Sequence, residues 1–262
     1  MAAGWERHRL WMWEGSRAAG EWLVEALDPK PGETVLELAA GTGETGFLAA
    51  ARVGNQGKLI STDFAPNMVE AAHTESQRLG LINVEHRTLD AENMDLPDSS
   101  IDGVLCRWGY MLMADPAGAF GETQRVLREG GAVAFSVFAE PERNPWAGIP
   151  DRLLADIGGP IPGPTAPGIF AMADQERTRS LLATAGLEEK RTEDVPITWR
   201  FAGFEGCWRF LLDIAGALSV RIAALTDDQR EAFREQLEEA LEPYRTEEGV
   251  ELPGLTRNTL AA

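Results

Sequence analysis

Short apolar runs and longer segments of helical periodicity alternate along the chain, and together they predict its secondary structure. The apolar runs, several of them rich in β-branched residues, predict strands. They occupy residues 34–38, 57–62, 83–88, 101–106, 132–138, 187–201 and 254–262. Apolar residues at helical spacing predict helices at 5–27 (one or two), 47–51, 66–79, 116–127, 144–157, 174–185, 204–225 and from 227 onward. Because strands and helices alternate through the first five strands, we expect a doubly wound α/β domain.

Turn-forming and capping residues mark the ends of several of these elements. Gly80 and Gly186 predict helix ends, and Thr226-Asp-Asp-Gln229 has the pattern of a capping box. Pro196 predicts a bulge within the long strand at 187–201. Prolines and glycines gather at 158–168, which is either a mobile connection at the edge of a lid or a surface loop without a role.

A glycine turn follows the first strand and leads directly into a helix. Gly41, Gly43 and Gly46 let the backbone approach a ligand, and the free N–H groups at the helix start point toward it. Their spacing matches the dinucleotide fingerprint G-x-G-x-x-G. Glu37, an acid in an otherwise apolar strand, favours a different ligand, because it would repel a pyrophosphate and attract an ammonium or sulfonium group. A glycine turn that binds no ligand is the remaining interpretation.

The spacing Glu37-x-x-x-Gly41-x-Gly43 resembles the first motif of class I S-adenosylmethionine (SAM) methyltransferases. The resemblance extends over residues 34–200, and the chain looks similar to the ubiquinone/menaquinone-biosynthesis branch of that family. It implies SAM as cofactor, S-adenosylhomocysteine as product, and a Rossmann-like seven-stranded sheet of order 3-2-1-4-5-7-6 whose last strand is antiparallel. The expected organisation is an N-terminal helical cap segment at 1–30, a SAM-binding domain at 31–202, a helical cap insert at 203–252 and a terminal strand at 253–262.

Acids and aromatic residues near strand ends predict further contacts with the cofactor. Asp63 stands 20 residues after Gly43, the offset at which Rossmann-like folds place an acid on ribose hydroxyls, although it could equally cap the next helix. The resemblance implies that Phe64 and Met68 sandwich the adenine and that Asp90 binds its exocyclic amine. The cofactor-binding residues expected are Glu37, Ala39, Gly41, Thr42, Gly43, Asp63, Phe64, Met68, Asp90, Ala91, Glu92, Arg107 and Trp108.

Aromatic residues outside the motif region predict an acceptor site. Trp11, Trp13, Tyr110 and Trp208 are the expected substrate-binding residues. Together with the apolar block at 204–218, they would enclose a flat, largely apolar ring above the transferable methyl group, because aromatic walls stack well on such rings. Tyr110 is also the candidate catalytic residue. The competing interpretation is that these residues form an ordinary second core.

Composition limits the partners. The chain has 42 acids against 24 bases and a formal net charge of −18, which argues against nucleic acid and anionic membranes as partners. Its two cysteines and three scattered histidines offer no metal site. With neither a signal peptide nor an apolar span, the expected location is the cytoplasm. The sequence makes no prediction of the oligomeric state.

The reaction expected is transfer of the methyl group of SAM to an O or C atom of a small acceptor by in-line displacement. Alignment of the two reactants would supply much of the acceleration. Two alternatives remain. An NAD-dependent oxidoreductase would use the same glycine turn, but the chain lacks a Tyr-x-x-x-Lys pair. A SAM-binding protein without catalysis would need no acceptor at all.

Overall fold

The computed structural model describes residues 2–157, 163, 166–213 and 216–262, with residues 2–8 described only as helical backbone. Most of the segment at 158–168, predicted to be a lid edge or a plain loop, therefore lies outside the described residues.

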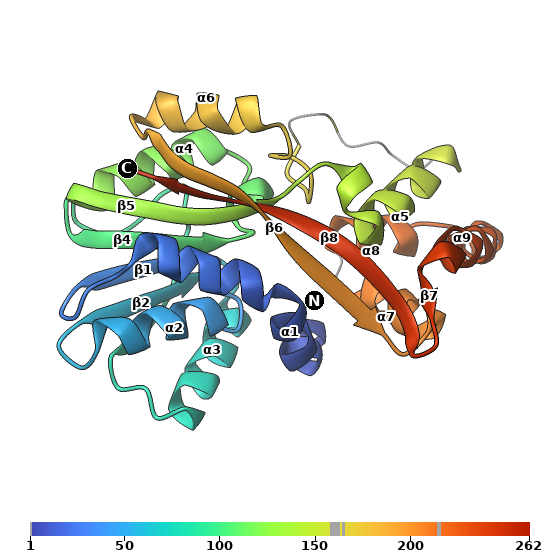
Figure 1. The fold of residues 1–262 in the computed structure, drawn as a ribbon, viewed down its shortest axis with the longest axis horizontal. Helices are drawn as coiled ribbons and strands as arrows, with labels where there is room; N and C mark the ends of the chain where they lie inside the picture. The colour runs from blue at the N-terminus through green and yellow to red at the C-terminus, as the bar shows by residue number, and fades with distance from the viewer. Residues whose placement is uncertain (1, 158–162, 164–165, 214–215) are drawn as a thin grey trace.

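A mostly parallel sheet forms the centre of the molecule (Figure 1). Its strands are β1 Thr34–Leu38, β2 Lys58–Asp63, β3 Val84–Thr88, β4 Ile101–Arg107, β5 Leu127–Phe138, β6 Glu189–Phe201, β7 Arg245–Thr246 and β8 Gly249–Ala261. The order β3-β2-β1-β4-β5-β8-β6 confirms the predicted order, with β8 as the antiparallel last strand. The two-residue β7, which pairs with the start of β8, is an addition to it.

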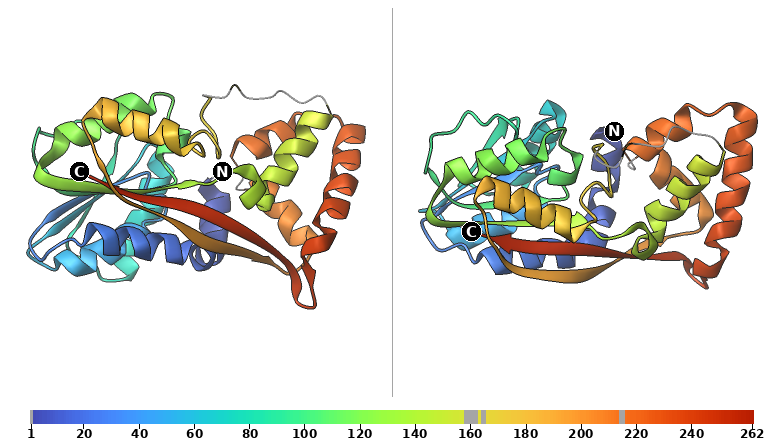
Figure 2. Two further views of the ribbon diagram at one scale, coloured as in Figure 1. Left: turned by 45° about the horizontal axis from the view of Figure 1, so that its top comes forward. Right: turned by 90° about the horizontal axis from the view of Figure 1, so that it is seen from above.

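Helices cover both faces of this sheet and extend beyond one end of it. They are α1 Ala2–Leu27, α2 Glu44–Val53, α3 Pro66–Arg78, α4 Pro116–Val126, α5 Pro145–Asp156, α6 Gln175–Ala185, α7 Phe204–Asp213, α8 Ala217–Ala223 and α9 Asp227–Leu241. The helices α1, α2 and α3 lie on one face and α4 and α6 on the other, while α5, α7, α8 and α9 gather beyond the carboxyl ends of the parallel strands (Figure 2). We call these last four helices the cap.

Local signals account for several helix ends. The carboxyl group of Asp115 accepts a hydrogen bond from the backbone of Gly118 at the start of α4. Thr226 and Gln229 form both bonds of the predicted capping box at α9. Gly186 ends α6 with φ +80°, the left-handed conformation that glycine adopts without a steric penalty.

Two expectations about the last strands need correction. The predicted bulge at Pro196 is wrong: Pro196 pairs in register with Leu255, and the register shift lies between Glu189 and Arg191. The missing N–H of proline is tolerated because β6 is an edge strand. The last strand also begins at Gly249 rather than at residue 253, because its first residues pair with the far end of β6.

The paired strands β6 and β8 connect the sheet to the cap. They run together from the sheet to the pair Phe201 and Val250, next to α7 (Figure 1). One continuous set of buried apolar residues extends from α4 and the parallel strands through Trp199 and Phe210 into the cap. A smaller apolar core fills the space between α1, α2 and the sheet. The cap is therefore packed onto the carboxyl ends of the strands.

Candidate functional site

The glycine turn between β1 and α2 presents open backbone at the carboxyl end of a central strand. Gly41 and Gly43 have φ values of +58° and +91°, and Ala39, an exposed residue, has φ +49°. A Cβ atom on Gly41 would meet no protein atom within 4 Å, whereas one on Gly43 would lie 2.4 Å from the ring of Phe47. The turn is thus packed on its inner side and accessible at Gly41. The free N–H groups at the start of α2 could therefore donate hydrogen bonds to a polar ligand bound at this opening.

Glu37 lies beneath this turn. Its side chain is 2% exposed and accepts hydrogen bonds from the backbone N–H of Gly46 at 2.7 Å and from the hydroxyl of Ser61 at 3.2 Å. A Cβ atom on Gly46 would lie 2.1 Å from a carboxyl oxygen of Glu37, so glycine is required there. Burial raises the pKa of Glu37 to about 8. The predicted attraction of an ammonium or sulfonium group by Glu37 therefore does not fit this burial, and Glu37 instead braces the first turn of α2.

Asp63 joins the end of β2 to the same turn. Its half-buried carboxylate accepts hydrogen bonds from the backbone N–H groups of Gly41 and Ala65, both at 2.9 Å. The alternative interpretation of Asp63 as helix cap is wrong, because α3 begins at Pro66 and its N-cap residue is Ala65. Each oxygen of Asp63 keeps a lone pair for a further donor.

The expected adenine-binding residues occupy the ends of β2 and β3. Phe64 is 75% exposed, and Met68 is partly buried in the first turn of α3. Asp90 is exposed and accepts a hydrogen bond from the backbone of Glu92 at 2.9 Å, next to the partly buried Ala91. The carboxylate of Glu92 accepts a hydrogen bond from the backbone of Ala114 at 2.7 Å, which ties this loop to the one after β4.

Arg107 ends β4 and Trp108 follows it, beside the turn. The guanidinium of Arg107 donates a hydrogen bond to the hydroxyl of Thr45 in α2 at 2.9 Å and lies 4.9 Å from the ring centre of Trp108. Burial lowers the pKa of Arg107, while the nearby carboxyl groups of Glu44 and Glu37 act to raise it. A Cβ atom on Gly109 would lie 2.7 Å from that of Ala39. The ends of β1 and β4 are therefore in direct contact.

The backbone of Trp108 is strained. Its φ is +61°, a conformation that bulky residues rarely adopt, and its side chain is only 7% exposed. Such strain persists where the surrounding structure imposes it, and it is concentrated at functional sites. The remaining predicted turn residue, Thr42, is 6% exposed and donates a hydrogen bond to Glu44 at 2.7 Å.

Tyr110, the predicted catalytic residue, lies in the core. Its side chain is 0% exposed, its hydroxyl is 2.6 Å from that of Thr123 in α4, and its ring stacks on Phe120 at 4.0 Å. Burial raises the pKa of Tyr110 well above its ordinary value. The geometry contradicts both roles predicted for Tyr110, as catalytic residue and as wall of the acceptor site.

Trp208 is a second correction on the acceptor side. Its ring packs 6.0 Å from that of Phe233 and 5.9 Å from the guanidinium of Arg234, both on α9. These contacts are internal to the cap, so the structure gives Trp208 a packing role.

The helix α1 brings Trp11 and Trp13 to two different places. Trp13 is partly buried beside Gly20, where an added Cβ atom would lie 2.9 Å from the Trp13 ring and 3.0 Å from the hydroxyl of Thr45. Trp13 therefore lies next to the first turn of α2. The indole of Trp11 donates to the backbone carbonyl of Arg200 at 2.5 Å, near the end of β6.

A salt-bridge clamp that sequence patterns did not predict holds α1 over the turn. The guanidinium of Arg9 lies 3.3 Å from the carboxylate of Glu44 in α2 and 3.0 Å from that of Glu75 in α3. No local signal indicates these pairs, because their partners are 35 and 66 positions away in the chain.

Seven rings from α1, the residue after β4, β5, α5, β6 and α7 form a continuous aromatic cluster. Its members are Trp11, Trp108, Phe138, Trp146, Trp199, Phe201 and Phe210, each with at least one other ring of the cluster within 6.1 Å. All except Trp11 are at most 8% exposed. Trp11 and Phe210, from the block at 204–218, therefore pack together as members of one cluster. The prediction that they enclose an acceptor stays a prediction.

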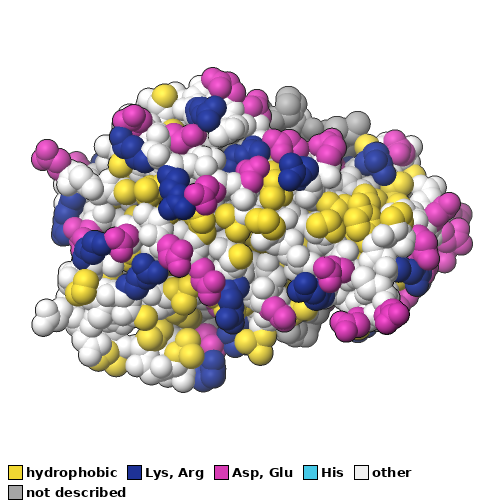
Figure 3. All heavy atoms as spheres, viewed as in Figure 1, with side chains coloured by type: hydrophobic (Ala, Val, Ile, Leu, Met, Phe, Trp, Pro, Cys, Tyr) yellow, Lys and Arg dark blue, Asp and Glu magenta, His cyan; other side chains and the backbone are white. Residues whose placement is uncertain are grey.

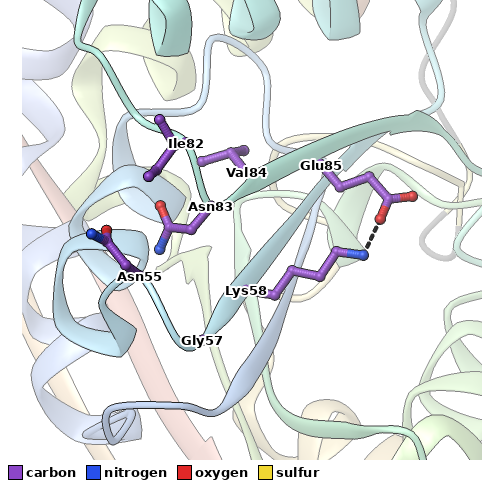
Figure 4. A pocket seen from close by; sticks show the side chains of 7 residues that line it. All are labelled: Asn55, Gly57, Lys58, Ile82, Asn83, Val84 and Glu85. Carbon is purple, nitrogen blue, oxygen red and sulfur yellow. Dashed lines mark ion pairs between the residues drawn. The ribbon is translucent and has the colours of Figure 1, made fainter.

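Other surface features of the described residues lie away from the glycine turn. A hollow of about 290 Å³ is lined by Asn55, Gly57, Lys58, Ile82, Asn83, Val84 and Glu85 (Figure 4). It lies at the amino ends of β2 and β3, on the edge opposite the glycine turn. Acidic and basic side chains intermingle on the face shown in Figure 3, without a basic stripe. Among the described residues there is no cluster of three potential metal ligands and no helix long and apolar enough to cross a membrane.

Comparison with known proteins shows which family this chain resembles. Residues 29–154 match a family model described as a methyltransferase domain. Aklanonic acid methyltransferase DauC of Streptomyces sp. (strain C5) is 35% identical over 147 residues, which are 53% of this chain and 66% of that enzyme. The chain thus matches just under two thirds of the length of that relative.

Two further relatives extend the match. The ubiquinone/menaquinone biosynthesis C-methyltransferase UbiE of Enterobacter sp. (strain 638) is 26% identical over 192 residues, covering 69% of this chain and 73% of UbiE. Among solved structures, one described as a methyltransferase from Bacillus halodurans has a TM-score of 0.65 and 19% identity, covering 92% of this chain and 97% of that one. At 19% identity, the similarity to the Bacillus halodurans structure is evidence for the fold alone.

Proposed function

We propose that this chain, which belongs to the class I SAM-dependent methyltransferases and is similar to the UbiE-like enzymes, transfers the methyl group of SAM to a small, flat, largely apolar molecule. SAM is the cofactor of this family. The observation that carries the proposal is the open, left-handed backbone at Ala39 and Gly41, at the carboxyl end of a central strand within the matched region. In open α/β sheets, ligands bind outside such strand ends.

The side chains around the turn fit the nucleoside part of SAM. Asp63 keeps lone pairs for two ribose hydroxyls while it holds the turn through Gly41. The exposed ring of Phe64 offers an unpacked aromatic face to an adenine, with Met68 nearby in sequence on α3. Asp90 is exposed on the loop after β3, as an acceptor for an exocyclic amine should be. These four residues would hold the adenosine.

Residues at the end of β4 fit the methionine part. The guanidinium of Arg107 is close to the first turn of α2, where it can pair with a carboxylate. Glu37 acts indirectly, because it holds the Gly46 N–H and thereby the path of the turn. We therefore assign Glu37 as a positioning residue rather than as a direct contact.

The chain promotes the reaction mainly by positioning. SAM supplies a methyl group bonded to a sulfonium sulfur, and the neutral thioether S-adenosylhomocysteine is a good leaving group. Holding the acceptor in line with that methyl can lower the barrier by about 7–11 kcal/mol. The aromatic cluster and the cap cover the carboxyl ends of β4 and β5, where Trp108 and Phe138 are buried. The described histidines are not placed to act as bases, since His86 pairs with Ser76 and His73 with Gln77 along α3 and β3.

The relatives and the aromatic cluster together support a class of acceptor. The names of DauC and UbiE record aklanonic acid and ubiquinone/menaquinone biosynthesis. A quinone, phenol or polyketide-like ring would suit the stacked aromatic walls of this chain. Trp199, Phe201 and Phe210 lie beyond the matched region, which ends at residue 154. The choice of acceptor therefore depends on parts of this chain that the family model does not cover.

Two alternatives fit the structure less well. An NAD-dependent oxidoreductase shares the glycine turn, but the relatives are methyltransferases and no Tyr-x-x-x-Lys pair is present in the sequence. A SAM-binding protein without catalysis would not need an aromatic cluster at the cofactor edge.

The test is a methyl-transfer assay with isotope-labelled SAM and a panel of naphthoquinols, phenols and hydroxyanthraquinones. We expect labelled product and S-adenosylhomocysteine to form together, with one class of ring favoured. SAM binding without turnover on any member of the panel would favour the non-catalytic alternative. NADH oxidation in place of methyl transfer would favour the oxidoreductase.

A further inference from the structure

Two indole N–H groups in the aromatic cluster have no hydrogen-bond partner among the described residues. They belong to Trp108 and Trp199, whose side chains are 7% and 1% exposed. A buried donor left unpaired is destabilising, and native proteins contain few of them. Other indoles in the cluster are satisfied: Trp11 donates to the carbonyl of Arg200, and Trp146 to the side chain of Asn144. Of the four tryptophans in the cluster, only Trp108 and Trp199 therefore have an indole N–H without a hydrogen-bond partner among the described residues.

These two tryptophans lie between the cofactor turn and the cap. Their ring centres are 6.1 Å apart. Trp108 is connected to the turn through the guanidinium of Arg107, which also bonds to Thr45. Trp199 packs against α1, where a Cβ atom on Gly15 would lie 2.6 Å from its ring. Both rings therefore lie on the path between the glycine turn and the cap.

We propose that Trp108 and Trp199 determine acceptor specificity by donating indole hydrogen bonds to an oxygen carried on the acceptor ring. This inference rests on the proposed function and narrows its substrate class. An indole N–H is a donor only, so its partner must be an acceptor such as a carbonyl or phenolate oxygen. A plain hydrocarbon leaves both donors unpaired, and a site built to bond an oxygen rejects analogues that lack it. The acceptor is therefore an oxygenated flat ring.

The experiment compares 9-fluorenone with fluorene, two flat molecules that differ by one carbonyl oxygen. Both are titrated into the wild-type protein saturated with S-adenosylhomocysteine. The readout is the indole N–H signals of the eight tryptophans in nitrogen-15 NMR spectra. We expect fluorenone to bind about tenfold more tightly than fluorene and to shift the signals of Trp108 and Trp199 downfield. Single W108F and W199F variants assign these signals, and W146F is the matched control because its indole already has a partner.

The outcomes separate this inference from the proposed function. The inference is supported if W108F and W199F reduce the preference for fluorenone while W146F keeps it. Equal binding of the two probes, no binding of either, or unmoved indole signals would overturn it. None of those results would affect SAM binding or methyl transfer to other acceptors, which are measured in separate assays. A variant that misfolds leaves the wild-type titration as the deciding measurement.

Discussion

Replacement of Glu37 by glutamine should remove a pH-dependent loss of stability from this protein. Burial sets the folded-state pKa of Glu37 at about 8, against an ordinary value of 4.5. Between those two values the folded protein holds a proton that the unfolded chain has released. The free energy of unfolding therefore falls as pH rises through this window, and the contribution of the group is fully present only below pH 4.5.

The size of the effect follows from the shift. One pKa unit corresponds to about 1.4 kcal/mol, so the whole window amounts to about 5 kcal/mol, of which about 3 kcal/mol falls between pH 6 and pH 9. Glutamine does not titrate, but its carbonyl can still accept from Gly46 and its amide can donate to Ser61. Alanine would instead leave the Gly46 N–H unpaired, at a cost of about 1–3 kcal/mol at every pH.

The assay is urea unfolding of wild type, Glu37→Gln and Glu37→Ala at pH 6, 7, 8 and 9 at constant ionic strength. We expect the stability difference between Glu37→Gln and wild type to shift in favour of the variant by about 3 kcal/mol over this range. Comparison with the variant cancels the titration of all other groups. A difference that stays constant from pH 6 to pH 9 would refute the reasoning, because Glu37 would then have the same charge in the folded and unfolded protein.

Three further predictions concern the cofactor and acceptor sides. Asp63→Ala should weaken SAM binding about ten- to a hundredfold in calorimetric titration, and Asp63→Asn less, because one acceptor oxygen remains; equal affinities for all three proteins would remove Asp63 from the site. Phe64→Ala should weaken SAM about two- to tenfold without destabilising the fold, whereas Ile82→Ala, at an equally exposed position away from the turn, should have no effect on binding. Tyr110→Phe should lower stability by about 0.5–1.5 kcal/mol and leave the rate of methyl transfer unchanged, so a large drop in rate at unchanged stability would restore its catalytic role.

Local patterns were sufficient to predict the strand, glycine turn and helix at the start of the sheet. The path from residue 34 through Gly41 and Gly43 into α2 is encoded in neighbouring residues: an apolar strand, glycines that adopt positive φ, and a helix start. The capping box of Thr226 and Gln229 is equally local. The order of the strands came from the family resemblance, and pairing in the structure confirms it.

Errors arose where distant residues decide the outcome. Pro196 pairs without a bulge because β6 is at the edge of the sheet, which depends on where β8 inserts. Tyr110 follows a strand whose end faces the site, but the 3-10 turn at Tyr110–Leu112 directs it under α4, where Thr123 supplies a partner.

The role of Glu37 shows the same dependence on a distant residue. The sequence revealed an unusual acid, but the direction of its side chain depends on the space left by Gly46 nine residues later. The alternation of residues along a strand predicts which face of the sheet a side chain lies on. It does not predict which residue that side chain contacts.

The most direct test of the central claim is calorimetric titration of SAM and NAD into wild type and Gly41→Val. Gly41 has φ +58° and open space where a Cβ atom would lie, so valine should strain the turn and occupy the ligand side without disturbing the sheet. We expect wild type to bind SAM and not NAD, and Gly41→Val to remain folded with SAM affinity reduced by roughly a hundredfold or more. Unchanged SAM affinity in Gly41→Val, or binding of NAD in place of SAM, would contradict the account.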